Sequence, residues 1–194
     1  MSGVERSVRD KILNATLACI EKEGLHSVRI RSIAGKAGVN SAAINYYFGS
    51  KKKLIDEALA LTMKNAIANY DILGEEGKSD IDKIIKFFSH NFDGVIDYPE
   101  IVKAWFYTPF TEKTYEPETF EWLKTFFEII SENVKKFHPE NDEREIKLAV
   151  IQILSVMIVP SIFPGNLDEF TGLSMKKPET RKAYIDMLIK RFFK

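Results

Sequence analysis

The chain contains 194 residues with a mass of 22.3 kDa; 45% of its residues are hydrophobic and 29% are charged. This composition is typical of globular proteins and excludes the disordered and collagen-like classes. The 28 basic and 28 acidic side chains cancel to a net charge of zero, so the whole chain lacks the positive excess expected of many nucleic-acid-binding proteins.

Three short helices and a longer fourth are predicted at the start of the chain. Apolar residues three or four positions apart indicate a first helix that ends at Gly24. The same periodicity predicts helices over 30–37 and 41–48, and a glycine follows each of them. The fourth helix begins at Lys51.

Helical periodicity also dominates the rest of the chain, and strand-like alternation is hard to find. Further helices are expected over 80–95, 99–107, 117–137, 141–159 and 178–193. The sequence therefore predicts an all-α protein of about nine helices. We divide it into an N-terminal domain over 1–50 and a larger helical domain over 51–194.

Charge is distributed unevenly between these two parts. Residues 1–53 hold ten basic and four acidic side chains, a net charge of +6, and the other 141 residues carry a net charge of −6. The overall zero is thus the average of a basic module and an acidic body. We expect nucleic acid to bind the basic module and the acidic body to face away from it.

Cysteine, histidine and apolar runs argue against several other classes. The single cysteine, Cys19, lies on the apolar stripe of the first helix, which favours buried packing over a disulfide or a reactive thiol. The three histidines are far apart and no nucleotide-binding or nucleophile motif is found, so we expect no metal, no cofactor and no catalysis. The most apolar run, 149–159, is about half the length that a bilayer requires. With no signal-peptide pattern at the N-terminus, a cytoplasmic protein without a membrane partner is expected.

The helices over 30–37 and 41–48 have the spacing of a helix-turn-helix. Gly38 between them suits a tight turn, because glycine adopts positive φ at little steric cost. Asn40 is a favourable N-cap for the second of the two.

These residues carry a family resemblance. The sequence IAGKAGVN at 33–40, followed by AINYYFGSK at 43–51 and by Leu54, resembles the N-terminal DNA-binding domain of the TetR family of transcriptional regulators. The resemblance spans about residues 9–61, roughly a quarter of the chain. It implies a three-helix DNA-binding domain, followed by a larger helical domain that binds a small effector and forms a dimer.

The third helix is expected to enter the major groove of double-stranded operator DNA. On its leading face the Asn45 amide can pair with adenine, and alanine methyl groups can contact thymine methyls. The resemblance implies phosphate contacts for Tyr46 and Lys51, whereas Tyr47 either contacts DNA or packs on the fourth helix. The predicted DNA-binding set is Arg29, Arg31, Ser41, Ala42, Ala43, Asn45, Tyr46, Tyr47 and Lys51.

Aromatic residues are concentrated in the body, since only three of the 23 precede Gly49. This density favours an apolar pocket between helices in addition to a core, and the resemblance implies that such a pocket holds a small-molecule effector. The expected apolar lining is Trp105, Phe106, Phe126 and Phe127, with His90, Tyr107 and Gln152 as polar anchors. Each of these residues can alternatively be an ordinary core residue.

The helix over 141–159 is apolar on nearly every face, so both of its sides must be covered. We expect one side to pack on the body and the other to meet a second copy of the chain. In the resembling family the two last long helices form a dimeric four-helix bundle. The predicted interface residues are Ile151, Leu154, Ile158, Tyr184, Met187 and Leu188.

The sequence thus predicts a transcriptional repressor that binds a palindromic operator as a homodimer and is released by a small apolar or aromatic effector. Two alternatives stay open. One is a helical adaptor or ligand-binding protein with a vestigial helix-turn-helix, which salt-dependent binding to duplex DNA would exclude. The other is an enzyme whose scattered carboxylates meet only in the folded chain.

Overall fold

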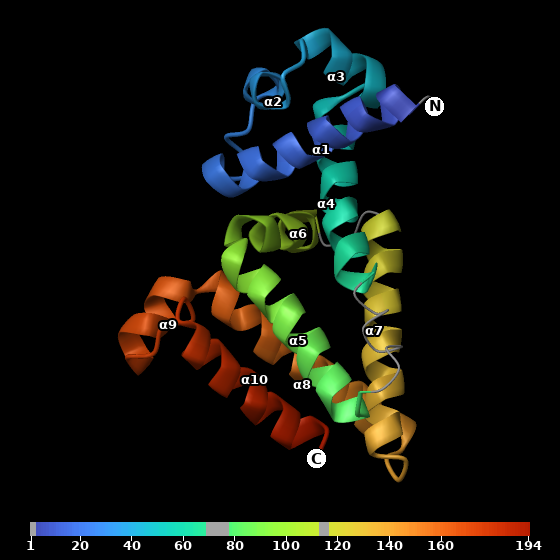
Figure 1. The fold of residues 1–194 in the computed structure, drawn as a ribbon, viewed down its shortest axis with the longest axis vertical. Helices are drawn as coiled ribbons and strands as arrows, with labels where there is room; N and C mark the ends of the chain where they lie inside the picture. The colour runs from blue at the N-terminus through green and yellow to red at the C-terminus, as the bar shows by residue number, and fades with distance from the viewer. Residues whose placement is uncertain (1–2, 69–77, 113–116) are drawn as a thin grey trace.

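The computed structural model describes residues 3–68, 78–112 and 117–194, and every regular element in these ranges is an α-helix (Figure 1). The predicted all-α class is confirmed. The helices are α1 (Gly3–Glu23), α2 (Ile30–Ala37), α3 (Ser41–Phe48), α4 (Lys51–Ala68), α5 (Asp80–Asp97), α6 (Pro99–Glu112), α7 (Pro117–Phe137), α8 (Glu143–Ile162), α9 (Pro164–Thr171) and α10 (Pro178–Phe192). Sequence patterns missed α9, because its leading Pro164-Gly165 pair is also a turn signal, although proline suits the first turn of a helix.

The N-terminal module has its own core, formed by α1, α2, α3 and the first half of α4 at one end of the molecule (Figure 1). Ile12, Ile33 and Ile44 are fully buried there. Cys19 is buried beside them as its position on the stripe predicts, and burial raises the pKa of its thiol. Two residues of α6, Ile101 and Ala104, complete this core, so the module is not closed without the body.

A second core lies in the body and joins α5, α7, α8 and α10. Phe87, Phe88 and Phe92 of α5 fill its centre, and the ring of Phe92 stacks on Tyr184 of α10 at 5.1 Å. Ion pairs from Arg181 to two aspartates of α5 hold α10 against α5. Figure 1 shows α4 running down from the N-terminal module to lie beside α7.

Helix α8 continues through Pro160, whereas the sequence predicted its end at Val159. Proline has no N–H to donate to the carbonyl four residues earlier, which leaves the Val156 oxygen without its helical partner. The Tyr184 hydroxyl of α10 donates to this oxygen at 2.8 Å. A side chain from a neighbouring helix therefore replaces the missing backbone bond, and α8 ends at Ile162.

The Tyr184 hydroxyl should consequently stabilise the body. In Tyr184→Phe the Val156 carbonyl loses its donor in a partly buried place, and we expect the free energy of unfolding to fall by about 1–2 kcal/mol. Chemical denaturation followed by circular dichroism measures this change. The matched control is Tyr98→Phe, because Tyr98 is exposed, and it should stay within about 0.5 kcal/mol of the unmodified protein. Equal stability of the two variants would show that the hydroxyl adds nothing.

The two faces of α8 differ. Ile146, Val150, Ile153 and Met157 point into the body core and are buried. Leu148, Ile151, Ser155 and Val159 follow one another at helical spacing on the opposite face and are exposed.

Among the described helices, α8 is the one long and apolar enough to cross a membrane by length and composition. Its buried face belongs to the core of the helical body, which is the usual reason for such a helix in a globular domain.

Candidate functional site

The turn between α2 and α3 is held by backbone geometry and a side-chain cap. Gly38 adopts the left-handed conformation, with φ of 69°, and the Val39 N–H donates to the Ala34 carbonyl. Asn40 then caps α3, because its side-chain oxygen accepts from the Ala43 N–H at 2.8 Å. The turn therefore fixes the angle at which α3 leaves α2.

Helix α3 presents one buried and one exposed face. Ile44 and Phe48 anchor it in the N-terminal core. On the other side Asn45 is exposed and Tyr46 is 78% exposed. An aromatic side chain this exposed in a folded domain is available to a partner. The exposed face lies at the end of the molecule farthest from the C-terminus (Figure 1).

The predicted DNA-binding residues fall into an exposed and a half-buried group. Arg29, Arg31, Ala42, Asn45 and Tyr46 are exposed. Ser41, Ala43, Tyr47 and Lys51 are half-buried. Tyr47 packs against the N-terminal core and touches the ring of Tyr46 edge-on at 5.1 Å, so a packing role for it is present in the structure.

The start of α4 adds a second anion-attracting feature next to α3. Ser50 precedes the helix and its hydroxyl accepts from the Lys53 N–H at 3.2 Å. The first turn carries Lys51, Lys52 and Lys53. Helix N-termini attract anions through free N–H groups and the helix dipole, and here three lysines strengthen that field.

One basic residue of the module has a structural role that charge counting did not reveal. Arg9 of α1 forms an ion pair with Glu57 of α4, and its guanidinium lies over the ring of Phe48 at 5.0 Å. The Arg9 guanidinium thus joins α1 to α4 and does not contribute its charge to the exposed face of α3.

A pocket of about 460 Å³ lies between the N-terminal module and the body. Its wall is mainly apolar and comes from α1, α4, α5, α6, α7 and α8. Of the residues predicted for an effector site, His90, Trp105, Phe106 and Phe126 line it. Tyr107, Phe127 and Gln152 are outside the lining: the Tyr107 ring packs on His26 at 4.4 Å, and the other two are exposed.

Helix α1 forms a part of the pocket that sequence reasoning missed. Asn14, Leu17, Ala18 and Glu21 all line it. They are spaced three, one and three positions apart, so they share one helix face, separate from the stripe that contains Cys19. This second stripe was visible in the sequence, but only the fold shows what it covers.

Glu21 joins the two parts of the molecule through the start of α6. Its Oε2 accepts from the backbone N–H of Glu100 at 3.1 Å and from that of Ile101 at 3.2 Å. A carboxylate at a helix N-terminus satisfies free donors and interacts favourably with the dipole. Burial raises the pKa of Glu21, while these two hydrogen bonds act in the opposite direction.

A second polar contact links α6 to α4 at the pocket wall. The Trp105 indole N–H donates to the Thr62 hydroxyl oxygen at 3.0 Å. Both residues line the pocket. A ligand in the pocket would therefore lie against the contacts that position α6 relative to α1 and α4.

The residues predicted for a dimer interface divide between surface and interior. Ile151 and Met187 are 57% and 74% exposed. Leu154 and Ile158 line the pocket, and Tyr184 reaches the Val156 carbonyl. Leu188 is only 3% exposed within the protomer, so it packs in the body core and has no surface left for a partner. The apolar pattern could not tell which side of α10 faces inward.

The described residues contain no group of three or more histidine, cysteine, aspartate or glutamate side chains able to hold a metal ion.

Comparison with known proteins connects this geometry to a family. Residues 12–58 match the model of the bacterial regulatory proteins of the tetR family. This match covers α2, α3 and the turn between them together with the parts of α1 and α4 that pack on them. The N-terminal module of the chain is therefore similar to the tetR family of bacterial regulatory proteins.

Relatives and solved structures agree with this similarity. The transcriptional regulator BetI of Vibrio vulnificus (strain YJ016) is 28% identical over 105 residues, which are 53% of each chain. The repressor KstR2 of Mycobacterium tuberculosis is 24% identical over 95 residues, 49% of this chain and 48% of that one. The chain therefore spans about half the length of these relatives.

The fold similarity extends further than the sequence similarity. FadR of Bacillus subtilis, solved in complex with stearoyl-CoA, superposes with a TM-score of 0.70 at 16% identity over 95% of this chain and 97% of that one. A TetR regulator of Legionella pneumophila gives a TM-score of 0.67 at 20% identity over 94% and 95%. The TetR-family fold thus includes the body as well as the N-terminal module.

The exposed face of α3 and the start of α4 generate a prediction for DNA. Tyr46→Ala and Lys51→Ala should each weaken binding to any duplex by up to about tenfold at low salt, because a phosphate contact is lost. Lys51→Ala should also reduce the slope of log affinity against log salt by about one. Fluorescence anisotropy with a labelled duplex at several salt concentrations measures both.

The matched control is Lys194→Ala, which removes a positive charge at the C-terminus, at the opposite end of the molecule from α3 (Figure 1). It should leave affinity and slope unchanged. Unaltered affinity in both Tyr46→Ala and Lys51→Ala would contradict the assignment of this face.

Proposed function

We propose that this chain is a DNA-binding transcriptional repressor of the TetR family that acts as a homodimer on a palindromic operator and is released by a small apolar or aromatic effector. The observation that carries the proposal is the pocket, whose wall is shared by α1 of the N-terminal module and by helices of the body. A ligand there touches the DNA-binding module directly. The repressive sign of regulation follows the family's commonest outcome and the description of KstR2 as a repressor.

The DNA-binding part of the proposal is supported by the exposed face of α3. Asn45, Tyr46 and the methyl group of Ala42 are available to base edges and phosphates in the major groove. Arg29 and Arg31 are exposed at the start of α2, the helix that precedes α3, and can contact the backbone. The net charge of +6 over residues 1–53 favours approach by this end.

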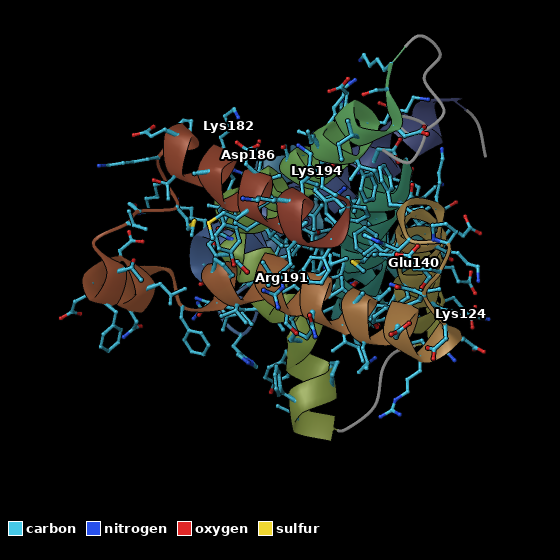
Figure 2. The ribbon with its side chains drawn as sticks, turned by 90° about the horizontal axis from the view of Figure 1, so that it is seen from below. Lys124, Glu140, Lys182, Asp186, Arg191 and Lys194 are labelled. Atoms are coloured by element: carbon cyan, nitrogen blue, oxygen red, sulfur yellow. The ribbon has the colours of Figure 1, made fainter. Side chains whose placement is uncertain are left out.

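A homodimer is supported by the exposed apolar stripe on α8. Leu148, Ile151 and Val159 form it, and Met187 projects from α10, which packs beside α8. Charged side chains, among them Lys182, Asp186 and Arg191, project from the same helix (Figure 2). An apolar centre with a charged rim is typical of protein interfaces, and a two-fold axis here would place both copies of α3 on one side of the dimer.

Release by an effector is supported by where the pocket lies. The ligand would contact Glu21 and Trp105, which position α6 against α1 and α4. If it binds more tightly when the two copies of α3 do not match successive major grooves, it lowers operator affinity by that difference. The proposed ligand site does not include Tyr107, which packs on His26, or Phe127 and Gln152, which are exposed.

Location in the cytoplasm forms part of the same proposal, since operator DNA is found there. The apolar length of α8 is assigned to its core face and to the proposed dimer interface rather than to a lipid bilayer.

Charged substitutions on the exposed stripe should separate the protomers. Ile151→Glu combined with Met187→Glu places four carboxylates in the proposed interface, and we expect a monomer at micromolar concentration with operator affinity reduced more than about tenfold. Both positions are exposed in the protomer, so folding should be retained. Sedimentation velocity gives the mass and anisotropy gives the affinity.

The control for this variant is Phe110→Glu, which changes an exposed aromatic residue of α6 and should remain dimeric. A dimeric double variant, or a monomeric unmodified protein at the same concentration, would rule out the proposed interface.

The function as a whole is tested by selecting bound duplexes from a random DNA pool. The expected product is a palindrome whose half-sites are about one helical turn or a multiple apart. Recovery of no enriched sequence at moderate salt would favour the alternative of a helical adaptor with a vestigial helix-turn-helix.

A further inference from the structure

The Lys, Arg, Asp and Glu side chains in the described pocket wall are of one sign only. Among the described lining residues Glu21 is the one carboxylate, and none is lysine or arginine. His90 also lines the pocket, but its side chain is exposed. A negatively charged ligand would thus find no fixed positive partner in the wall, whereas a positively charged group would find the Glu21 carboxylate.

The rest of the pocket wall also suits a cation with an attached apolar body. Trp105, Phe106 and Phe126 supply aromatic surface, and aromatic faces attract cations as well as apolar groups. Leu17 and Met157 add aliphatic surface. The Trp105 N–H is already used by Thr62, so the indole offers its ring rather than its donor.

The two oxygens of Glu21 are in different situations. Oε2 accepts both backbone N–H groups at the start of α6, whereas Oε1 accepts no hydrogen bond from the described residues. Burial raises the pKa of Glu21, as does the nearby Glu100 carboxylate, whereas the two backbone donors and Lys103 act in the opposite direction. A cationic partner would likewise stabilise the charged form of Glu21.

We propose that the pocket takes a ligand with an apolar or aromatic body and a cationic head, and that the head binds Glu21 in competition with the N-terminus of α6. This inference rests on the proposed role of the pocket as the effector site. Binding of the head weakens the hold of α1 on α6, because the carboxylate is then shared between the ligand and the two backbone donors. The ligand thereby acts on the N-terminal module through a residue of that module.

Three probes of equal length and different charge test the ligand class: 4-phenylbutylammonium, 4-phenylbutanol and 4-phenylbutyrate. Isothermal titration calorimetry on the full chain should give the tightest binding for the ammonium, about tenfold weaker binding for the alcohol and the weakest for the carboxylate. This order is measured on the unmodified protein and does not depend on any variant folding.

Glu21→Gln then assigns the preference to one side chain, since glutamine keeps an oxygen acceptor for α6 and loses the charge. We expect about tenfold weaker binding of the ammonium and less than about threefold change for the alcohol. Glu23→Gln is the matched control: Glu23 lies two residues away on α1, is exposed and does not line the pocket, so the preference for the ammonium should persist.

The coupling is measured on the unmodified protein with its selected duplex. The ammonium should lower DNA affinity more than the alcohol does at equal occupancy of the pocket. Equal binding of the ammonium and the alcohol, or an unchanged preference in Glu21→Gln, overturns the cationic class and leaves the pocket as an effector site. Failure of all three probes to bind overturns the inference and also counts against the pocket as an effector site, while operator binding by α3 stands apart from both results.

Discussion

The docking of α6 on α1 is the contact on which the arrangement of the molecule depends. Ile101 and Ala104 of α6 complete the core of the N-terminal module, and Glu21 of α1 in return satisfies the first N–H groups of α6. Each partner thus supplies what the other lacks: apolar surface in one direction and a hydrogen-bond acceptor in the other. Since α4 also contributes to the N-terminal core and continues into the body, the two parts are joined by buried contacts rather than by a free linker.

The free energy of this contact indicates how large an effect a ligand could have by weakening it. A capping interaction is worth about 1–2 kcal/mol, and a tenfold change in an equilibrium needs about 1.4 kcal/mol. Loss or sharing of one cap is therefore enough to shift the balance between two arrangements of α1 and α6 noticeably, without any change in the body core. The core of α5, α7, α8 and α10 is held by stacked rings and by the ion pairs of Arg181, and Val102 of α6 is buried in it.

The helix-turn-helix was predictable from the sequence because its signals are local. Gly38, Asn40 and the alternation of Ile44 and Phe48 with exposed residues act within a few positions of the chain, and the structure places them as their chemistry requires.

The pocket was harder to predict from the sequence, because it depends on which helix covers which face. Trp105 and Phe126 were recognised by aromatic density, whereas Glu21 belongs to a second stripe of α1 whose partner is decided only by tertiary packing. Leu188 was assigned to a dimer surface for the same reason, since an apolar stripe does not reveal whether it faces inward or outward.

The participation of α1 in the pocket wall also bears on how such proteins can be recombined. In a chimaera that exchanges the first 50 residues of two relatives, the exchanged part is the proposed DNA-binding domain. In this chain the same segment carries Asn14, Leu17, Ala18 and Glu21, so it would take a share of ligand recognition with it. A chimaera that kept only the body would lose the Glu21 carboxylate, which lines the pocket and caps α6. Operator preference and part of the ligand preference would therefore be transferred together.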